Sequence, residues 1–410
     1  IGVDVAAFND SRLSDDRTAS GVRTATTVVS VSAATAPTAG QVLTATGGSA
    51  ATWQTPSAGI GGSTGATDNA VLRADGSGGS TVQTSAISIA DLHTASPNTT
   101  VNFVSMTPVG GTTNVGFAIV PKGTGPLTAQ VPDGTTAGGN ARGANATDWQ
   151  TSRSAATQVA SGSTATIVGG ANNTASGTGS TVGGQNNTVS NTGCTAFGSS
   201  NSVSGNANGF ALGYLNNVTG GEGPGALGYQ CTVSGNHGAL ATGYACITTD
   251  RAGFSGGQNA RAYLPGQRAH AAGQFAAAGD GQYTRVTPTI KTTDATPTDM
   301  ALRVLFGDRR IDVPSGKLIA CVLHVVGVKS DGSAVADYLR RFRVKNVGGT
   351  TTIVGSVGTI GTDHEDNAST DLSVSADDTN DAIKVTVTGI AAETWRWTAT
   401  LHCTEVAYGT

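Results

Sequence analysis

The chain has 410 residues, of which only 12% are charged and 5% are aromatic, whereas 59 are glycine. So few large apolar side chains exclude a single thick hydrophobic core, and a formal net charge of -4 provides no basic stripe that would condense on phosphates. No segment approaches the roughly 18 apolar residues of a transmembrane helix. We therefore expect no nucleic acid partner and no membrane insertion.

The first 160 residues contain four segments with a distinctive sequence. They read AFNDSRLSDDR at 7–17, APTAGQVLTATGGSAATWQ at 36–54, GSTGATDNAVLRADGSGGSTVQTS at 62–85 and PDGTTAGGNARGANATDWQ at 132–150. These segments resemble connector modules of bacteriophage tail-fibre and related virion appendage proteins. The resemblance implies an N-terminal fibre and connector segment over 1–57, which meets tail or baseplate proteins, and β-rich triple-stranded shaft modules over 58–160.

A repeat of 14 to 16 residues occupies residues 161–282. Glycine recurs at this spacing, and a small or β-branched residue stands two positions before it. The glycines are Gly170, Gly184, Gly198, Gly213, Gly228, Gly243, Gly257 and Gly273, and the preceding residues are Val168, Val182, Ala196, Ala211, Ala226, Ala241, Ser255 and Ala271. Because the unit is too short for a helical hairpin, it predicts two short strands and two turns per coil of an eight-turn solenoid.

The repeat resembles the head of the trimeric autotransporter adhesins, whose units also alternate a small residue plus Gly with a Val-Ser-Gly step, as at Val203 to Gly205. The resemblance implies a YadA-type, left-handed parallel β-roll. An inner column of Ala and Val buries little apolar surface in one chain. We therefore expect an elongated, all-β fibre in which the chain forms a homotrimer.

The composition changes after about Asp280, and residues 283–410 hold 13 basic and 15 acidic side chains. Strand-like runs recur between turn clusters such as Ser330-Asp331-Gly332, which predicts an antiparallel β-sandwich tip. The runs are at 301–306, 317–328, 338–347, 351–357, 382–388 and 394–406. The segments 292–300 and 381–406 also resemble the terminal domain of phage fibres.

The tip holds the densest ionisable cluster of the sequence. Regular repeats present similar small side chains at every turn, whereas specific binding needs varied polar and charged groups. We therefore predict receptor binding within 283–410, although a solvated loop also explains the cluster. The candidate receptor-binding residues are Asp363, His364, Glu365, Asp366, Asp331 and Tyr338. No metal-ligand spacing is present, so we expect no metal and no cofactor.

Catalysis would require paired carboxylates or a Ser/His/Asp set. The repeat region contains only Glu222, Asp250 and Asp280 as acidic residues, and the two aspartates occupy turn positions. We therefore expect no catalytic residues and no enzyme.

Five cysteines, an odd number without CxxC spacing, predict free thiols and no disulfide. The pair Trp395 and Trp397 is expected on one face of a strand, in the core or as a sugar-stacking platform.

Together these expectations describe an extracellular component of a phage virion that attaches to the host. The main interpretation is a structural and receptor-binding tail-fibre protein whose C-terminal tip binds a host surface glycan or protein. The alternatives are a capsid-mounted head fibre, a bacterial trimeric surface adhesin and, last, a polysaccharide-degrading tailspike.

Overall fold

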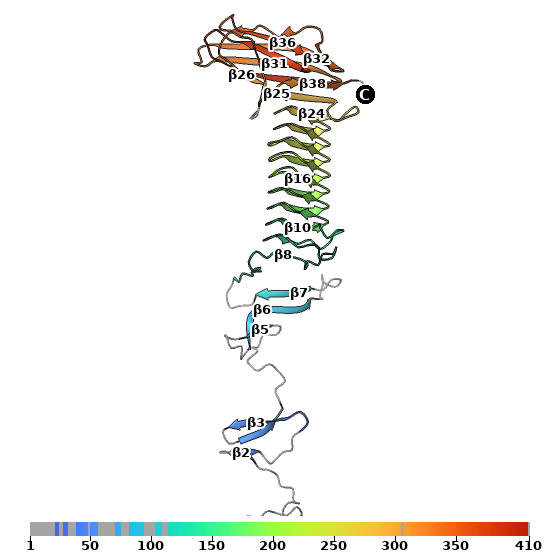
Figure 1. Ribbon diagram of the computed structural model, residues 1–410, viewed down its shortest axis with the longest axis vertical. Coiled ribbons are helices and arrows are strands. Elements are labelled where there is room, and N and C mark those ends of the chain that lie inside the picture. Colours follow the sequence, from blue (N-terminus) through green and yellow to red (C-terminus); the bar gives the residue numbers. More distant parts are fainter. Residues whose placement is uncertain are drawn as a thin grey trace, which may run out of the picture. The chain divides into compact units, whose positions relative to one another are not determined.

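The computed structural model describes residues 21–23, 28–31, 38–47, 50–55, 70–74, 82–93, 103–108, 114–304 and 307–408. It has two compact units, residues 1–119 and 120–410. Every regular element among these described residues is a β-strand, so the predicted all-β class is confirmed (Figure 1). The connector segment at 7–17 lies outside the described residues, as do parts of those at 36–54 and 62–85. No helix in the described part is long and apolar enough to cross a membrane.

The first unit contains two small sheets. One has the order β1-β2-β4-β3, and the other is the antiparallel sheet β5-β6-β7. Their strands are β1 (Gly21–Arg23), β2 (Val28–Val31), β3 (Val42–Gly47), β4 (Ala50–Gln54), β5 (Ala70–Ala74), β6 (Val82–His93) and β7 (Phe103–Pro108).

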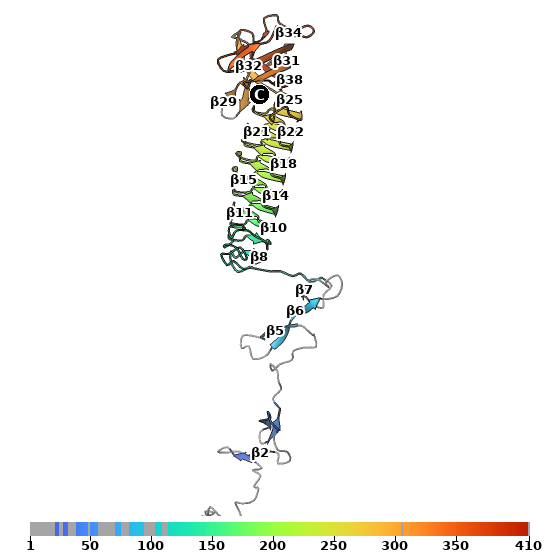
Figure 2. The same ribbon diagram turned by 90° about the vertical axis from the view of Figure 1, so that its right-hand side faces the viewer.

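The second unit begins with a β-solenoid, which confirms the predicted architecture of the repeat region (Figure 2). Within residues 120–304, all of which are described, long and short parallel strands alternate. The long strands, which continue β8 (Leu127–Thr128) and β9 (Thr147–Asp148), are β10 (Thr166–Ala171), β12 (Thr181–Gln185), β14 (Thr195–Ser199), β16 (Phe210–Tyr214), β18 (Gly225–Tyr229), β20 (Leu240–Tyr244), β22 (Phe254–Gln258) and β24 (Arg268–Ala272). The short strands are β11 (Thr174–Ala175), β13 (Thr188–Val189), β15 (Ser202–Val203), β17 (Asn217–Val218), β19 (Thr232–Val233), β21 (Ile247–Thr248) and β23 (Arg261–Ala262).

The glycine that anchors each coil is required by close contact between coils. Gly184 has a φ of +103°, and a Cβ added there would lie 2.0 Å from the carbonyl oxygen of Gly198 in the next coil. A side chain would therefore both strain the backbone and separate the coils. This explains why glycine recurs at this point of the repeat.

The register corrects the prediction at both ends of the solenoid. In the first coil Ile167, not Val168, pairs with Val182 and is buried, because the strand shifts register between Ile167 and Gly170. In the last coil Ala271, not Gly273, pairs with Gly257. The chain has already left the solenoid at Gly273.

Buried asparagines fill one corner of the coils, a feature that the sequence analysis did not identify. The side chain of Asn201 donates to Asn187 Oδ1 at 2.9 Å and to the Gly213 carbonyl at 2.9 Å. Asn216 in turn donates to Asn201 Oδ1 at 3.0 Å. This ladder satisfies backbone groups that the tight corners leave unpaired.

The tip is an antiparallel sandwich, as predicted. Its larger sheet contains β25 (Gly281–Val286), β26 (Thr289–Thr292), β31 (Lys317–Lys329), β32 (Val335–Val347), β33 (Thr350–Ile353), β34 (Gly358–Thr359), β35 (His364–Glu365) and β38 (Trp395–Ala407). The facing sheet contains β27 (Thr298–Asp299), β30 (Ile311–Asp312), β36 (Asp371–Asp377) and β37 (Ala382–Thr388), and β28 (Leu302–Val304) pairs with β29 (Gly307–Arg309).

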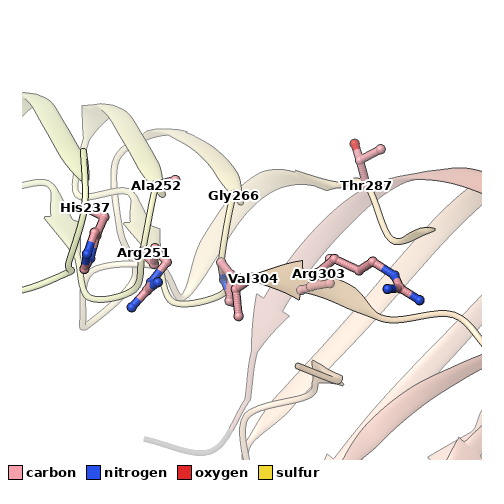
Figure 3. A pocket seen from close by; sticks show the side chains of 9 residues that line it. His237, Arg251, Ala252, Gly266, Thr287, Arg303 and Val304 are labelled. Carbon is pink, nitrogen blue, oxygen red and sulfur yellow. The ribbon is translucent and has the colours of Figure 1, made fainter. Parts of the chain in front are cut away.

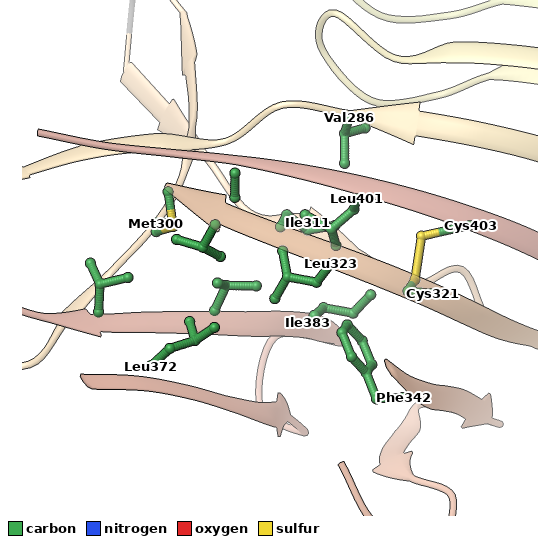
Figure 4. Close-up of a cluster of buried hydrophobic side chains, with 14 of the residues drawn as sticks. Val286, Met300, Ile311, Cys321, Leu323, Phe342, Leu372, Ile383, Leu401 and Cys403 are labelled. Atoms are coloured by element: carbon green, nitrogen blue, oxygen red, sulfur yellow. A yellow bond between two sulfur atoms is a disulfide. The ribbon is translucent and has the colours of Figure 1, made fainter. Parts of the chain in front are cut away.

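Large apolar side chains fill the space between the two sheets (Figure 4). Trp395 and Trp397 are at most 1% exposed, so they are core residues rather than a sugar-stacking platform. Cys321 and Cys403 stand opposite each other on β31 and β38 and form a disulfide. The prediction that the chain has no disulfide is therefore wrong, while Cys194, Cys231 and Cys246 are free and buried as expected.

A buried polar network connects the solenoid to the tip. The Glu405 carboxylate forms an ion pair with Lys317 and accepts hydrogen bonds from Thr284 at 2.7 Å and Gln282 at 3.0 Å. Gln267, in the last coil, donates to the same carboxylate at 3.4 Å. In addition β24 pairs with β25, so the long-strand sheet of the solenoid continues into the tip. These contacts fix the two parts against each other.

Candidate functional site

A groove lies where the last coils meet the tip, and we call it the junction groove (Figure 3). Its larger part, about 370 Å³, is lined by solenoid turns and by β28, including His237, Arg251 and Val304. Its smaller part, about 260 Å³, shares Arg251 and Val304 and adds Asp250 and Arg309. Loops that cover a regular scaffold in this way are a common place for binding sites.

The local sequence explains why the groove forms at this point. In the central coils the turn after the short strand consists of small residues such as Ser234-Gly235, whereas the corresponding turn of the later coil is Thr249-Asp250-Arg251. The hairpin of β28 and β29 adds a further wall from the tip. Asp250 therefore takes the place of Gly235, and Arg251 that of Asn236, where the solenoid ends.

The carboxylates of Asp250 and Asp312 both lie close to the guanidinium of Arg309, which lines the smaller part of the groove. Arg309 Nη2 lies 3.7 Å from Asp250 Oδ2 and 3.7 Å from Asp312 Oδ2. The two oxygens are therefore no more than twice this distance apart. Burial raises the pKa of Asp312 above its usual value, and the negative charge of Asp250 adds to the rise. Two neighbouring carboxyl groups on one arginine, one of them with a raised pKa, are the kind of side chains that acid and base catalysis uses.

This arrangement corrects the interpretation of Asp250. Its Oδ1 does accept a hydrogen bond from the Arg251 backbone at 2.7 Å, which is the predicted turn role. Its Oδ2 nevertheless faces Arg309 from another part of the chain. Asp312 and Arg309 cannot be recognised from the sequence, because their proximity to Asp250 depends on how the tip folds back on the solenoid.

The structure places the predicted receptor-binding residues beside β32. Asp363 forms a bidentate ion pair with Arg340, with Nη2 to Oδ2 at 2.8 Å, and this hydrogen bonding lowers the pKa of Asp363. Glu365 accepts a hydrogen bond from the Tyr338 hydroxyl at 2.6 Å. Because Tyr338 is only 1% exposed, burial raises its pKa.

The remaining predicted residues are also close to β32. Asp366 Oδ2 accepts from the Val335 backbone at 2.9 Å, and Asp331 Oδ1 accepts from the Ser333 backbone at 2.9 Å in the turn between β31 and β32. His364 is exposed and pairs across strands with Asp337. Most polar atoms of the predicted cluster thus bind within the tip, and their role in recognition stays a prediction.

Among the described residues, no group of three or more His, Cys, Asp or Glu side chains is arranged to hold a metal ion.

No protein-family model and no curated protein matches the chain. Two similar solved structures are phage tailspikes. The tailspike protein gp49 of Acinetobacter baumannii bacteriophage Fri1, a capsular polysaccharide depolymerase, is 7% identical with a TM-score of 0.20, and the match covers 58% of this chain and 61% of that one. The tailspike protein of Acinetobacter phage vB_ApiP_P1 is 10% identical with a TM-score of 0.18, and the match covers 65% of this chain and 55% of that one.

The expectation that the chain is not an enzyme is therefore corrected. A capsular polysaccharide depolymerase is among the structures to which the chain is similar. Asp250 lines the smaller part of the junction groove, and Asp312, which lines neither part, lies 3.7 Å from the same Arg309 Nη2 atom.

Proposed function

We propose that this chain is a tail appendage protein of a bacteriophage virion and that its junction groove binds a bacterial surface polysaccharide. The observation that carries the proposal is the groove itself. It combines a volume of about 370 Å³ with cationic side chains such as Arg251 and Arg303 and apolar surface from Leu302 and Val304. Saccharides present both hydroxyl groups and apolar ring faces, so they need this mixed lining.

Blocking the groove tests this proposal. Val304 lines both parts of the groove, so Val304→Trp should fill it. The matched control is Val131→Trp, at an exposed valine that lies before β9 and lines neither part of the groove. The labelled full chain is applied to an array of bacterial capsular and O-antigen polysaccharides. We expect Val304→Trp to lose the binding that the wild type and Val131→Trp share. Equal binding by all three proteins would exclude the groove.

A second candidate function, cleavage of the bound polysaccharide, is favoured by the carboxylate pair. Hydrolysis of a glycosidic bond needs one carboxylic acid to protonate the leaving oxygen and one carboxylate to activate water or attack the sugar. Asp312, whose pKa is raised, would serve as the acid, and Asp250 as its partner. The separation set by Arg309 does not exceed the roughly 9.5 Å that such pairs span.

The release of new reducing ends measures this activity. Asp312→Asn and Asp250→Asn should each abolish it while the protein still binds the polysaccharide on the array. The control is Asp371→Asn, at an exposed aspartate of β36 that lines neither part of the groove. Unchanged release in both variants would show that the pair is not catalytic. No release by the wild type, together with binding, would leave the chain with the binding function alone.

The predicted homotrimer is likewise our proposal, and an exposed apolar surface supports it. The outward positions of the long strands carry apolar side chains in successive coils. Phe197 pairs with Leu212, and Leu212 with Leu227. Tyr214, Tyr229 and Tyr244 stack beside them with ring centroids 5.3 and 5.1 Å apart. We call this surface the aromatic face. A contiguous uncharged patch of this kind is typical of a protein interface.

The resemblance to the YadA-type head supports the same assembly. Attachment to tail or baseplate proteins is proposed for the N-terminal side, on the resemblance of the connector segments alone. Such a protein would be located outside the host cell, on the virion.

A further inference from the structure

The outward face of the larger tip sheet is strongly basic, which composition could not reveal. Strands β24, β25, β26, β38, β31 and β32 expose one face to solvent and turn the other toward the core. Seven lysines and arginines occupy outward positions, and we call this surface the basic face. They are Arg268, Arg285, Lys291, Arg341, Arg343, Lys345 and Arg396.

Acidic residues are nearly excluded from this surface. Among the outward positions of these six strands, Asp337 is the one acidic residue, and it contacts His324 at 2.8 Å. None of the seven cations lies within 4.0 Å of a carboxylate in the part of the chain that the structure describes. The whole chain nevertheless has a formal charge of -4. These seven cations therefore form a positive surface that has no ion-pair partner among the described residues.

The cations are also placed against one another at a cost in stability. Arg268 stands directly opposite Arg285, and Lys291 stands opposite Arg396 on the neighbouring strand. Like charges that face each other across an antiparallel pair destabilise a sheet. An anion bound between them would remove this repulsion. The arrangement is thus unfavourable for folding and favourable for binding anions.

The basic residues form rows across the sheet. Arg285 is opposite His402, which is opposite Val322, which is opposite Arg341. Neighbouring strands are about 4.8 Å apart, so Arg285 and Arg341 are separated by three strand spacings, or about 14 Å, along this row. Val322 and Val326 are 39% and 44% exposed and provide apolar surface between the rows. A flat, extended polyanion fits this pattern better than a small ligand does.

The basic face is continuous with the junction groove. A further pocket of about 240 Å³ is lined by Arg268 and Arg285 together with Gly266 and Thr287. Gly266 and Thr287 also line the larger part of the groove. A polymer held in the groove can therefore extend over the arginines of the face.

We propose that the basic face binds the carboxylate or phosphate groups of an anionic polysaccharide that also enters the junction groove. The inference rests on the proposed function and names the chemical class of its ligand. Single-stranded nucleic acid is a poorer fit because such ligands stack on aromatic side chains, and Tyr283 is the one aromatic residue at the outward positions of these strands. Arginine pairs, by contrast, suit the bidentate recognition of carboxylate and phosphate groups.

Charge reversal on the full chain tests the proposal. The test variant is Arg285→Glu/Arg341→Glu/Arg396→Glu. The control, Lys122→Glu/Arg261→Glu/Arg310→Glu, reverses the same number of charges at exposed positions outside the face and the groove. The probes are polygalacturonate, a phosphate-bearing teichoic acid, neutral dextran and random-sequence duplex DNA, each at several salt concentrations. Affinity and oligomeric mass are measured for every protein.

We expect the wild type and the control to bind at least one of the two anionic glycans, with an affinity that falls as salt rises. The test variant should bind it at least tenfold more weakly, and dextran should not bind. Polygalacturonate and teichoic acid distinguish a carboxylate from a phosphate ligand.

Equal affinity of the test variant and the control would overturn the proposal. So would tighter binding of duplex DNA than of either glycan, or a loss of oligomeric mass in the test variant, which would assign the face to contacts between copies. If the wild type binds only neutral polysaccharides on the array, and Val304→Trp abolishes that binding, this inference is refuted while the proposed function stands.

Discussion

Arg268 on β24 and Arg285 on β25 stand directly opposite each other where the parallel coils of the solenoid give way to the antiparallel tip. Their strands join the two parts into one sheet, and their side chains begin the basic face. The same junction contains the groove with Asp250 and Arg309. The shared sheet and the charged surface residues therefore occur at the same junction. The coils before it present uncharged side chains on their long strands.

Reduction of the Cys321–Cys403 disulfide should destabilise the tip. The bond joins residues that are 82 apart in the sequence, and closing such a loop typically contributes about 2 to 4 kcal/mol. Calorimetry with and without a phosphine reductant should show a lower melting temperature for the tip transition. The double variant Cys321→Ala/Cys403→Ala should melt at a low temperature in both conditions. A wild-type melting temperature that is the same with and without the reductant would contradict the prediction.

Loss of one buried asparagine should weaken the solenoid. Asn201→Ala removes a side chain that donates to Asn187, Phe197 and Gly213 and that accepts from the Asn216 backbone. Leaving a buried polar group without its partner costs about 1 to 3 kcal/mol. Chemical denaturation should therefore give a lower free energy of unfolding. Asn217→Ala, at an exposed position of the next coil, is the control and should change it little.

Much of the solenoid was predictable because each coil repeats its own signal. The asparagines at 173, 187, 201 and 216 follow the repeat as closely as the glycines do, so the ladder was available to sequence analysis. The register shift between Ile167 and Gly170 could not be predicted, because the spacing of the glycines does not reveal an irregularity within a strand.

The tip chemistry could not be read in the same way. The Cys321–Cys403 pair depends on the register of two strands far apart in the sequence. The pairing of Asp250 and Asp312 on Arg309 requires the tip to fold back on the solenoid. The basic face requires both the order of strands and the orientation of every second residue. The alternation of side chains along one strand predicts which residues lie on each of its two faces. It does not predict which residues of the neighbouring strands lie on the same face of the sheet.

A charge on the aromatic face should prevent self-association. Leu212→Arg places a cation among Phe197, Leu227 and Tyr214, where a bound copy would leave it buried and unpaired. Light scattering should report a trimer for the wild type and a smaller mass for the variant. Thr219→Arg, at an exposed position after the short strand of the same coil, should remain trimeric. A wild type that is monomeric at micromolar concentration would refute the assembly.

The ion pair between Asp363 and Arg340 should stabilise the tip in a pH-dependent way. Hydrogen bonding to Arg340 lowers the pKa of Asp363 below its ordinary value of 3.8. A carboxyl group with a lowered pKa in the folded state stabilises it at pH values above the unfolded pKa. This contribution decreases as the pH falls through the folded pKa, because both states then bind the proton. Asp363→Asn should therefore lower the melting temperature by a constant amount at neutral and mildly acidic pH, and the difference should shrink below about pH 3.8. In an Arg340→Gln background the same substitution should have little further effect, since the partner charge is already absent. A difference between wild type and Asp363→Asn that persists unchanged at low pH would show that the side chain acts through packing and not through its charge.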